Sequence, residues 1–359
     1  MINKVLKFPF YAKATLILIG LYVLMEILYN LKGIIVPLVF AMIIAIVLNP
    51  LVDFIVRWKI NRIVAILMSI LLVFLIIATI FFFLFSQASQ FSDSWPGLVD
   101  KSTAIFNQTI AWFSSYFDIN IENIQNWILK AKAELLKASS TIIESTLLSV
   151  GSMMMVLFLI PVYVFLFLYY KPLLREFIYR LFGPVHEGKV SEIIPQTESV
   201  IQHYLIGLLI EAVIIGTLNS IGLLILGIDF AIMLGVMGAL LNVIPYIGGI
   251  VAVALPMLVA LATKSSGMYA LYVLAVYYTI QLIDNHYVVP IIVASKVKIN
   301  ALFSIIIILG GNALWGISGM FLSLPLLAIV KIIFDHIEPL QPWGFLLGNT
   351  QGADKNSKA

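Results

Sequence analysis

The sequence predicts an all-α, polytopic membrane protein. Hydrophobic residues make up 62% of the 359 residues and charged residues only 11%, against about a quarter in an ordinary soluble domain. A soluble fold of this length needs more polar side chains, because large exposed apolar patches drive association. Several uncharged runs reach the roughly 20 residues that a helix needs to cross a bilayer. We expect about six full spans, two broken helical hairpins and a small external helical domain.

The first half of the chain contains four of these spans. The first three lie within residues 1–85, at 14–30, 33–56 and 63–85. The first has no small-residue cleavage site and leads directly into the second, so it is expected to be a mature helix and not a signal peptide. Residues 86–146 are polar with apolar positions at helical intervals, and are expected to form an external domain that either gates or caps the protein. The fourth span is expected at 147–170.

The second half is expected to hold the transport core. Residues 171–204 read as a cytoplasmic interfacial linker, with a loop around Gly188 that precedes Pro195. The core then occupies 205–340 and includes full spans at 205–227 and 268–283. A cytoplasmic tail is expected at 341–359.

Two apolar stretches within the core, 230–263 and 299–330, are too long for single spans. As continuous helices each would extend about 50 Å, well beyond the hydrocarbon thickness of about 30 Å. Broken backbone inside a membrane is tolerated only where protein or water surrounds it, so each stretch is expected to be a hairpin broken within the bilayer. The breakers are Asn242, Pro245, Gly248 and Gly249 in the first stretch, and Gly310, Gly311, Gly316 and Gly319 in the second.

A few polar residues fall inside the apolar segments and are candidates for the transport pathway. Ionisable groups at this depth are costly enough to suggest a function, and a carboxylate there could exchange a proton for a cation. Side-chain amides beside a broken helix could coordinate an ion or a polyol. Interhelical hydrogen bonding and helix capping are the competing uses. The candidates are Glu211, Asn219, Asn242, Asp284, Asn285 and Asn312.

An ordered set of residues between 242 and 325 allows a comparison with a known family, and the resemblance extends over essentially the whole chain. It consists of Asn242-Val243-Ile244-Pro245-Tyr246-Ile247-Gly248, Asp284-Asn285 followed by Pro290, Gly310-Gly311, Gly316, Gly319 and Leu324-Pro325. Together these residues resemble the AI-2E family of transporters. The resemblance implies a bacterial inner-membrane transporter that exports a small polar solute such as autoinducer-2, a quorum-sensing signal. Other members are associated with sodium or lithium for proton antiport, which is the alternative here.

The same resemblance favours a homo-oligomer, with a pentamer as the expected number of subunits. Small residues in the spans also offer packing surfaces between neighbouring helices. A membrane scaffold that transports nothing is a further alternative, but a scaffold has no need of breaks inside the bilayer.

Enzymatic, metal and nucleic-acid functions receive no support. The chain has no cysteine, which rules out disulfides, cysteine-ligated zinc and thiol nucleophiles. His203 and His286 have no ligand spacing for a metal, and a net charge of +3 does not indicate nucleic acid. Gly316-Ile317-Ser318-Gly319 matches the nucleophile motif of intramembrane serine proteases, but the only later histidine lies beyond the last apolar stretch. No phosphate-binding loop or other cofactor motif is present.

The distribution of lysine and arginine predicts the orientation. Basic clusters precede the first span, separate the second from the third and follow the fourth, which all fall on one side if the spans alternate. By the positive-inside rule that side is cytoplasmic, and so are both termini. A single cysteine introduced within 349–359 should therefore react with an impermeant thiol reagent only after the membrane is permeabilised. Labelling in intact cells would contradict this topology.

Overall fold

A computed structural model describes residues 9–117, 130, 133–134, 158–182, 187–243, 247–264, 266–293 and 299–348. Every regular element in this part of the chain is helical, which confirms the predicted all-α class. Five of the described helices are long and apolar enough to cross a membrane, or up to six if the bent pair Phe158–Tyr169 and Lys171–Leu181 is one span. The polytopic membrane architecture is confirmed on the same ground.

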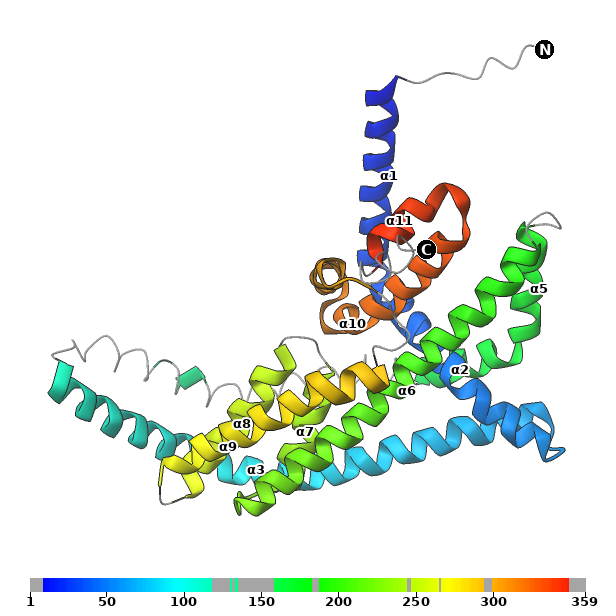
Figure 1. Cartoon of the computed structure of the whole chain (residues 1–359). Helices are drawn as coiled ribbons and strands as arrows, with labels where there is room; N and C mark the ends of the chain where they lie inside the picture. Colours follow the sequence, from blue (N-terminus) through cyan, green and yellow to red (C-terminus); the bar gives the residue numbers. More distant parts are fainter. Residues whose placement is uncertain are drawn as a thin grey trace, which may run out of the picture.

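The N-terminal helices are α1 (Phe10–Asn30), α2 (Lys32–Arg57) and α3 (Arg62–Phe117). α1 has no buried residue, and Figure 1 shows its N-terminal half extending away from the other helices, while its other end contacts α2 and α10 (Ala301–His336). α3 is one helix of 56 residues, so the first part of the expected external segment continues the third span without a break. Leu98 of this extension joins a buried cluster with Val259 of α8. Most of 118–157, including much of the fourth span, lies outside the described residues.

The central element is α6 (Glu187–Ile225), which contacts α2, α5, α7, α9, η2 and α10. The expectation of a loop around Gly188 is wrong, because α6 begins before it and continues through Pro195. Tertiary contacts that follow the proline along the helix help to explain how the helix persists. Glu198 pairs with Lys171 and Arg175 of α5 (Lys171–Phe182), and the side chain of Gln202 donates to the Ile46 carbonyl at 2.7 Å.

The first broken stretch forms α7 (Ala231–Asn242) and α8 (Ile247–Thr263), which pack against each other. The contact at the break is close: a Cβ atom at Gly248 would overlap the backbone of Leu241. Pro245 lies outside the described residues. The chain continues as α9 (Met268–Ile283) and then as the π-helix η2 (Asp284–Val293).

The second broken stretch is α10 (Ala301–His336), which folds back on itself at Gly316. Gly316 has φ 63° and ψ −142°, a conformation that favours glycine. The two arms then touch: Ser323 Oγ donates to the Ile307 carbonyl at 2.9 Å, and Gly311 lies directly against Gly319. The break therefore falls at one of the predicted glycines. Whether either hairpin re-enters the membrane stays a prediction.

The beginning of the expected C-terminal tail is helical. Residues 338–347 form η3 (Glu338–Leu340) and α11 (Gln341–Leu347), which pack on α10. Asn300 connects the two ends of this unit, because its side chain donates to the Leu346 carbonyl at 2.7 Å while its Oδ1 accepts from the Phe303 amide at 3.0 Å.

The close contact between the arms of α10 predicts that Gly311→Ala destabilises the protein. The new Cβ would overlap the Gly319 backbone, and overpacking of this kind costs about 1–3 kcal/mol. Gly310→Ala is the matched control, because a Cβ there meets nothing within 4 Å. Thermal unfolding in detergent should show a lower midpoint for Gly311→Ala and an unchanged or higher one for Gly310→Ala. Equal shifts would contradict the fold-back.

Candidate functional site

α6 and α7 approach each other closely, and this approach depends on small residues. A Cβ at Gly235 of α7 would come within 2.6 Å of the Ser220 backbone nitrogen, and one at Gly216 of α6 within 3.3 Å of Ala239 Cβ. Small residues let two helix backbones approach in this way without a cavity. The close packing brings the C-terminal end of α7 beside the middle of α6.

At that end of α7 one side-chain amide lies between two carboxylates. Asn242 Nδ2 donates to Asp284 Oδ2 at 3.1 Å and to Glu211 Oε1 at 3.4 Å. Gln281 Nε2 also donates to Asp284 Oδ2, at 3.4 Å. Three elements, α6, α7 and the start of η2, therefore meet at a single nitrogen atom. We call Glu211 and Asp284 the carboxylate pair, and Asn242 the bridge between them.

Both carboxylates are buried within the protomer. Asp284 is 1% exposed and Glu211 8% exposed. Among the described residues, Asp284 Oδ1 has no hydrogen-bond partner. Two negative charges this close together repel strongly when water is excluded. The arrangement therefore favours a positive charge at the pair, either a proton on one carboxylate or a bound cation.

A second polar group lies two helical turns away along both α6 and α9. A Cβ at Gly238 would come within 3.3 Å of Tyr277 Oη and 3.4 Å of Asn219 Nδ2, so these two side chains converge over the same glycine. Tyr277 Oη and Asn219 Oδ1 are both buried and without a hydrogen-bond partner among the described residues. Because Asn219 follows Glu211 on α6 and Tyr277 precedes Asp284 on α9, polar atoms extend about 11 Å from the carboxylate pair.

The structure separates the predicted pathway residues into two sets. Glu211, Asn242 and Asp284 come together, with Asn219 two turns along α6. Asn285 and Asn312 have exposed side chains, and neither forms a side-chain hydrogen bond with Glu211, Asn242 or Asp284 in the described part of the chain. They stay predictions for other parts of a pathway.

Two polar residues of the site were not predicted from the sequence. Gln281 and Tyr277 precede Asp284 on the same helical face, by three and seven positions. Because residues three and seven positions before Asp284 lie on its face of a helix, helical periodicity would have identified both residues from the sequence. No group of three or more acidic or histidine side chains with metal-ligand geometry occurs within the described residues.

Comparisons with known proteins agree with the membrane architecture. A family described as "AI-2E family transporter" matches residues 14–338. The chain is 27% identical to the "AI-2 transport protein TqsA" of Escherichia coli, over 88% of this chain and 90% of that protein. It is 23% identical to the "Putative transport protein YueF" of Bacillus subtilis, over 84% and 83% of the two chains. It is 24% identical to the "Putative permease PerM" of Escherichia coli, over 77% and 78%.

The bridge predicts a stability effect that is independent of any transported substrate. Asn242→Leu removes the amide and leaves both carboxylates without this donor, which should cost about 1–3 kcal/mol. Asn312→Leu is the control, because Asn312 is exposed. Chemical or thermal unfolding in detergent should show a clear loss of stability for Asn242→Leu alone. Similar stability of both variants would contradict a structural bridge at Asn242.

Proposed function

Because the chain belongs to the AI-2E transporter family, we propose that it is a secondary transporter in which Glu211 and Asp284 exchange a proton for a monovalent cation. The supporting observation is the pair of buried carboxylates that share one amide nitrogen. Burying two carboxylates costs free energy, so a buried pair of this kind is a candidate site for binding a proton or a cation. The proposed location is the bacterial inner membrane.

Exchange at the pair follows from its chemistry. In one state a proton on one carboxyl group offsets the repulsion, and Asn242 donates to the other oxygens. In the other state a monovalent cation takes the place of the proton, and a rotated Asn242 side chain presents its Oδ1 as a neutral ligand. Carboxylate and amide oxygens are ligands that hard cations prefer. One site that holds either ion, but not both, couples the two fluxes.

The broken hairpin supplies the movement that transport requires. Asn242 is the last residue of α7, next to the break that precedes α8. Discontinuous helices often form the ion sites of secondary transporters, since the ends of the half-helices can shift and their free carbonyls can bind ions. A change in the α7–α8 break moves the bridge relative to Glu211 and Asp284. We propose that this movement opens the pair to one side of the membrane at a time.

Export of a small polar solute is the second candidate. The relative TqsA carries the name of an AI-2 transport protein, and the 27% identity of this chain with it supports a related cargo. Neutral hydrogen-bonding groups suit a polyol, and Asn219 and Tyr277 offer two such groups with unsatisfied atoms. In this version the carboxylate pair supplies the ion coupling. Asn285 and Asn312 are proposed to line the pathway elsewhere.

The proposed transporter is a homo-oligomer, and a pentamer is our working number. The apolar side chains of α1 have no cover in the protomer, so lipid or a neighbouring subunit must contact them. Native mass spectrometry in mild detergents should give a mass above that of one chain.

The function is tested with purified protein reconstituted into liposomes that carry a pH-sensitive dye. An imposed sodium or lithium gradient should drive a pH change with the wild type, and Glu211→Gln and Asp284→Asn should each reduce its rate by at least about tenfold, or about 1.4 kcal/mol. Glu26→Gln is the matched control, because Glu26 is an exposed carboxylate whose only described side-chain partner is Asn30 of the same helix.

The outcomes separate the candidates. Cation-driven pH change that survives both neutralisations would contradict exchange at the pair. Flux of a labelled polyol without any cation-coupled pH change would support the second candidate and end the antiport proposal. No flux of either kind under imposed gradients would leave the scaffold alternative as the better account.

A further inference from the structure

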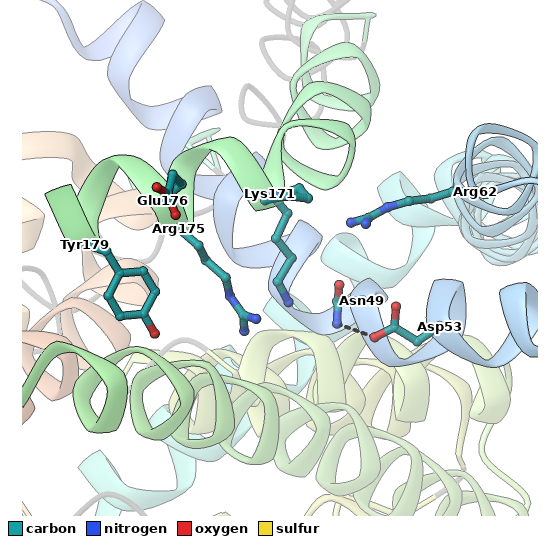
Figure 2. Close-up of a pocket in the computed structure, with 8 residues that line it drawn as sticks. Asn49, Asp53, Arg62, Lys171, Arg175, Glu176 and Tyr179 are labelled. Carbon is teal, nitrogen blue, oxygen red and sulfur yellow. Dashed lines mark hydrogen bonds between the residues drawn. The ribbon is translucent and has the colours of Figure 1, made fainter. Parts of the chain in front are cut away.

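A charged cavity lies near the beginning of α6, away from the carboxylate pair, where α2, α3 and α5 meet. It measures about 300 Å³ and is lined by residues of α2, the start of α3 and α5. Figure 2 shows Lys171 and Arg175 extending in the same direction from α5, with Arg62 facing them from α3. The lining residues are Asn49, Asp53, Arg62, Lys171, Pro172, Arg175, Glu176 and Tyr179.

The cavity lies at a bend in the chain. The helix over Phe158–Tyr169 and the helix over Lys171–Leu181 form an angle of 64°, with Lys171 directly after the bend. Arg62 Nη2 donates to the Leu168 carbonyl at 3.0 Å and so connects α3 to the last turn before the bend. An amphipathic helix that leaves a span at this angle is suited to lie in the membrane interface. The cavity therefore opens where lipid headgroups are found.

The fixed charges around the cavity leave an excess of one positive charge. Lys171 Nζ and Arg175 Nη2 both approach the same oxygen, Glu198 Oε2, at 3.0 and 2.8 Å. Glu176 is paired outside the cavity with Arg180 at 2.8 Å, and Asp53 accepts from Asn49 at 2.9 Å. Among the residues that line the cavity, the three basic side chains of Arg62, Lys171 and Arg175 face two carboxylates, Asp53 and Glu176. One carboxylate oxygen shared by two cations leaves both of them with free donors.

Two guanidinium donors of residues that line the cavity are buried. Arg62 Nε and Arg175 Nε lie away from solvent and have no hydrogen-bond partner among the described residues. A guanidinium presents its donors in a planar fork that matches two oxygens of a phosphate. Buried polar groups without partners are costly. A phosphate group between Arg62 and Arg175 would offset this cost and cancel the excess charge.

Apolar side chains beside the cavity identify the source of the phosphate. Leu173, Phe177 and Leu181 on α5 are exposed, and so are Phe54 and Trp58 near the end of α2. In a membrane these side chains lie at the depth of the acyl chains and the interface, where tryptophan is enriched. Free phosphate would gain nothing from them, whereas a phospholipid would place its chains along this surface.

We propose that this cavity binds the phosphodiester of an anionic phospholipid, with Arg62, Lys171 and Arg175 as the ligands and the α5 surface against its acyl chains. Basic pockets between membrane helices are suited to such headgroups. The site is independent of ion exchange at Glu211 and Asp284. It connects the lipid to α6 through Glu198.

The test uses the purified, delipidated full-length protein and phosphatidylglycerol as the probe, with binding followed by native mass spectrometry. The wild type should retain phosphatidylglycerol, and the double variant Arg62→Gln/Arg175→Gln should bind it at least about tenfold more weakly. Arg57→Gln is the matched control. Arg57 is the last residue of α2, whose residues Asn49 and Asp53 line the cavity, but Arg57 itself does not line it. Lys171→Gln is a milder variant in case the double variant does not fold.

Two further probes identify the source and exclude non-specific binding. Diacylglycerol with the same chains, which lacks the phosphate, should not displace phosphatidylglycerol, and neither should millimolar inorganic phosphate. Displacement by diacylglycerol would show a purely apolar site, and displacement by phosphate would show a free-anion site; either would overturn the proposal. Unchanged phosphatidylglycerol binding in folded Lys171→Gln and in the double variant would overturn it as well.

Discussion

The arrangement of the core depends on one amide group between two buried carboxylates. Carboxylates in an apolar setting need a partner, and here Asn242 lies within hydrogen-bonding distance of both Glu211 and Asp284. This requirement fixes several features at once. α7 has to end beside α6, which requires the small residues Gly216 and Gly235 at their crossing. η2 has to begin at the same point.

The beginning and the middle of α6 then have different tasks. Glu198, near its cytoplasmic-side beginning in the predicted topology, pairs with Lys171 and Arg175 next to the charged cavity. Glu211, about 20 Å further along the helix, belongs to the carboxylate pair. A rigid helix with an anchored end and a titrating side chain in its middle is a fixed support. The movement that we propose for the α7–α8 hairpin would take place against this support.

The sequence alone predicted the fold class, both broken stretches and four of the residues that the structure places in or beside the site. The prediction succeeded where an ionisable residue interrupts or ends an apolar run, as with Glu211 and Asp284. It also succeeded where the backbone adopts a positive φ that favours glycine, as at Gly316. It failed around Gly188, where it predicted a loop, because α6 begins before this residue and is held by contacts that Glu198 and Gln202 make with distant helices. Local propensity contains no information about such contacts.

The direct test of the central claim is proton release when a cation binds. Sodium or lithium chloride is added to purified protein in a weakly buffered solution, and the released protons are measured beside a choline chloride control. Exchange at the carboxylate pair predicts saturable release that approaches one proton per protomer and is absent in Glu211→Gln. Cation binding without proton release, or equal release from Glu211→Gln, would contradict it.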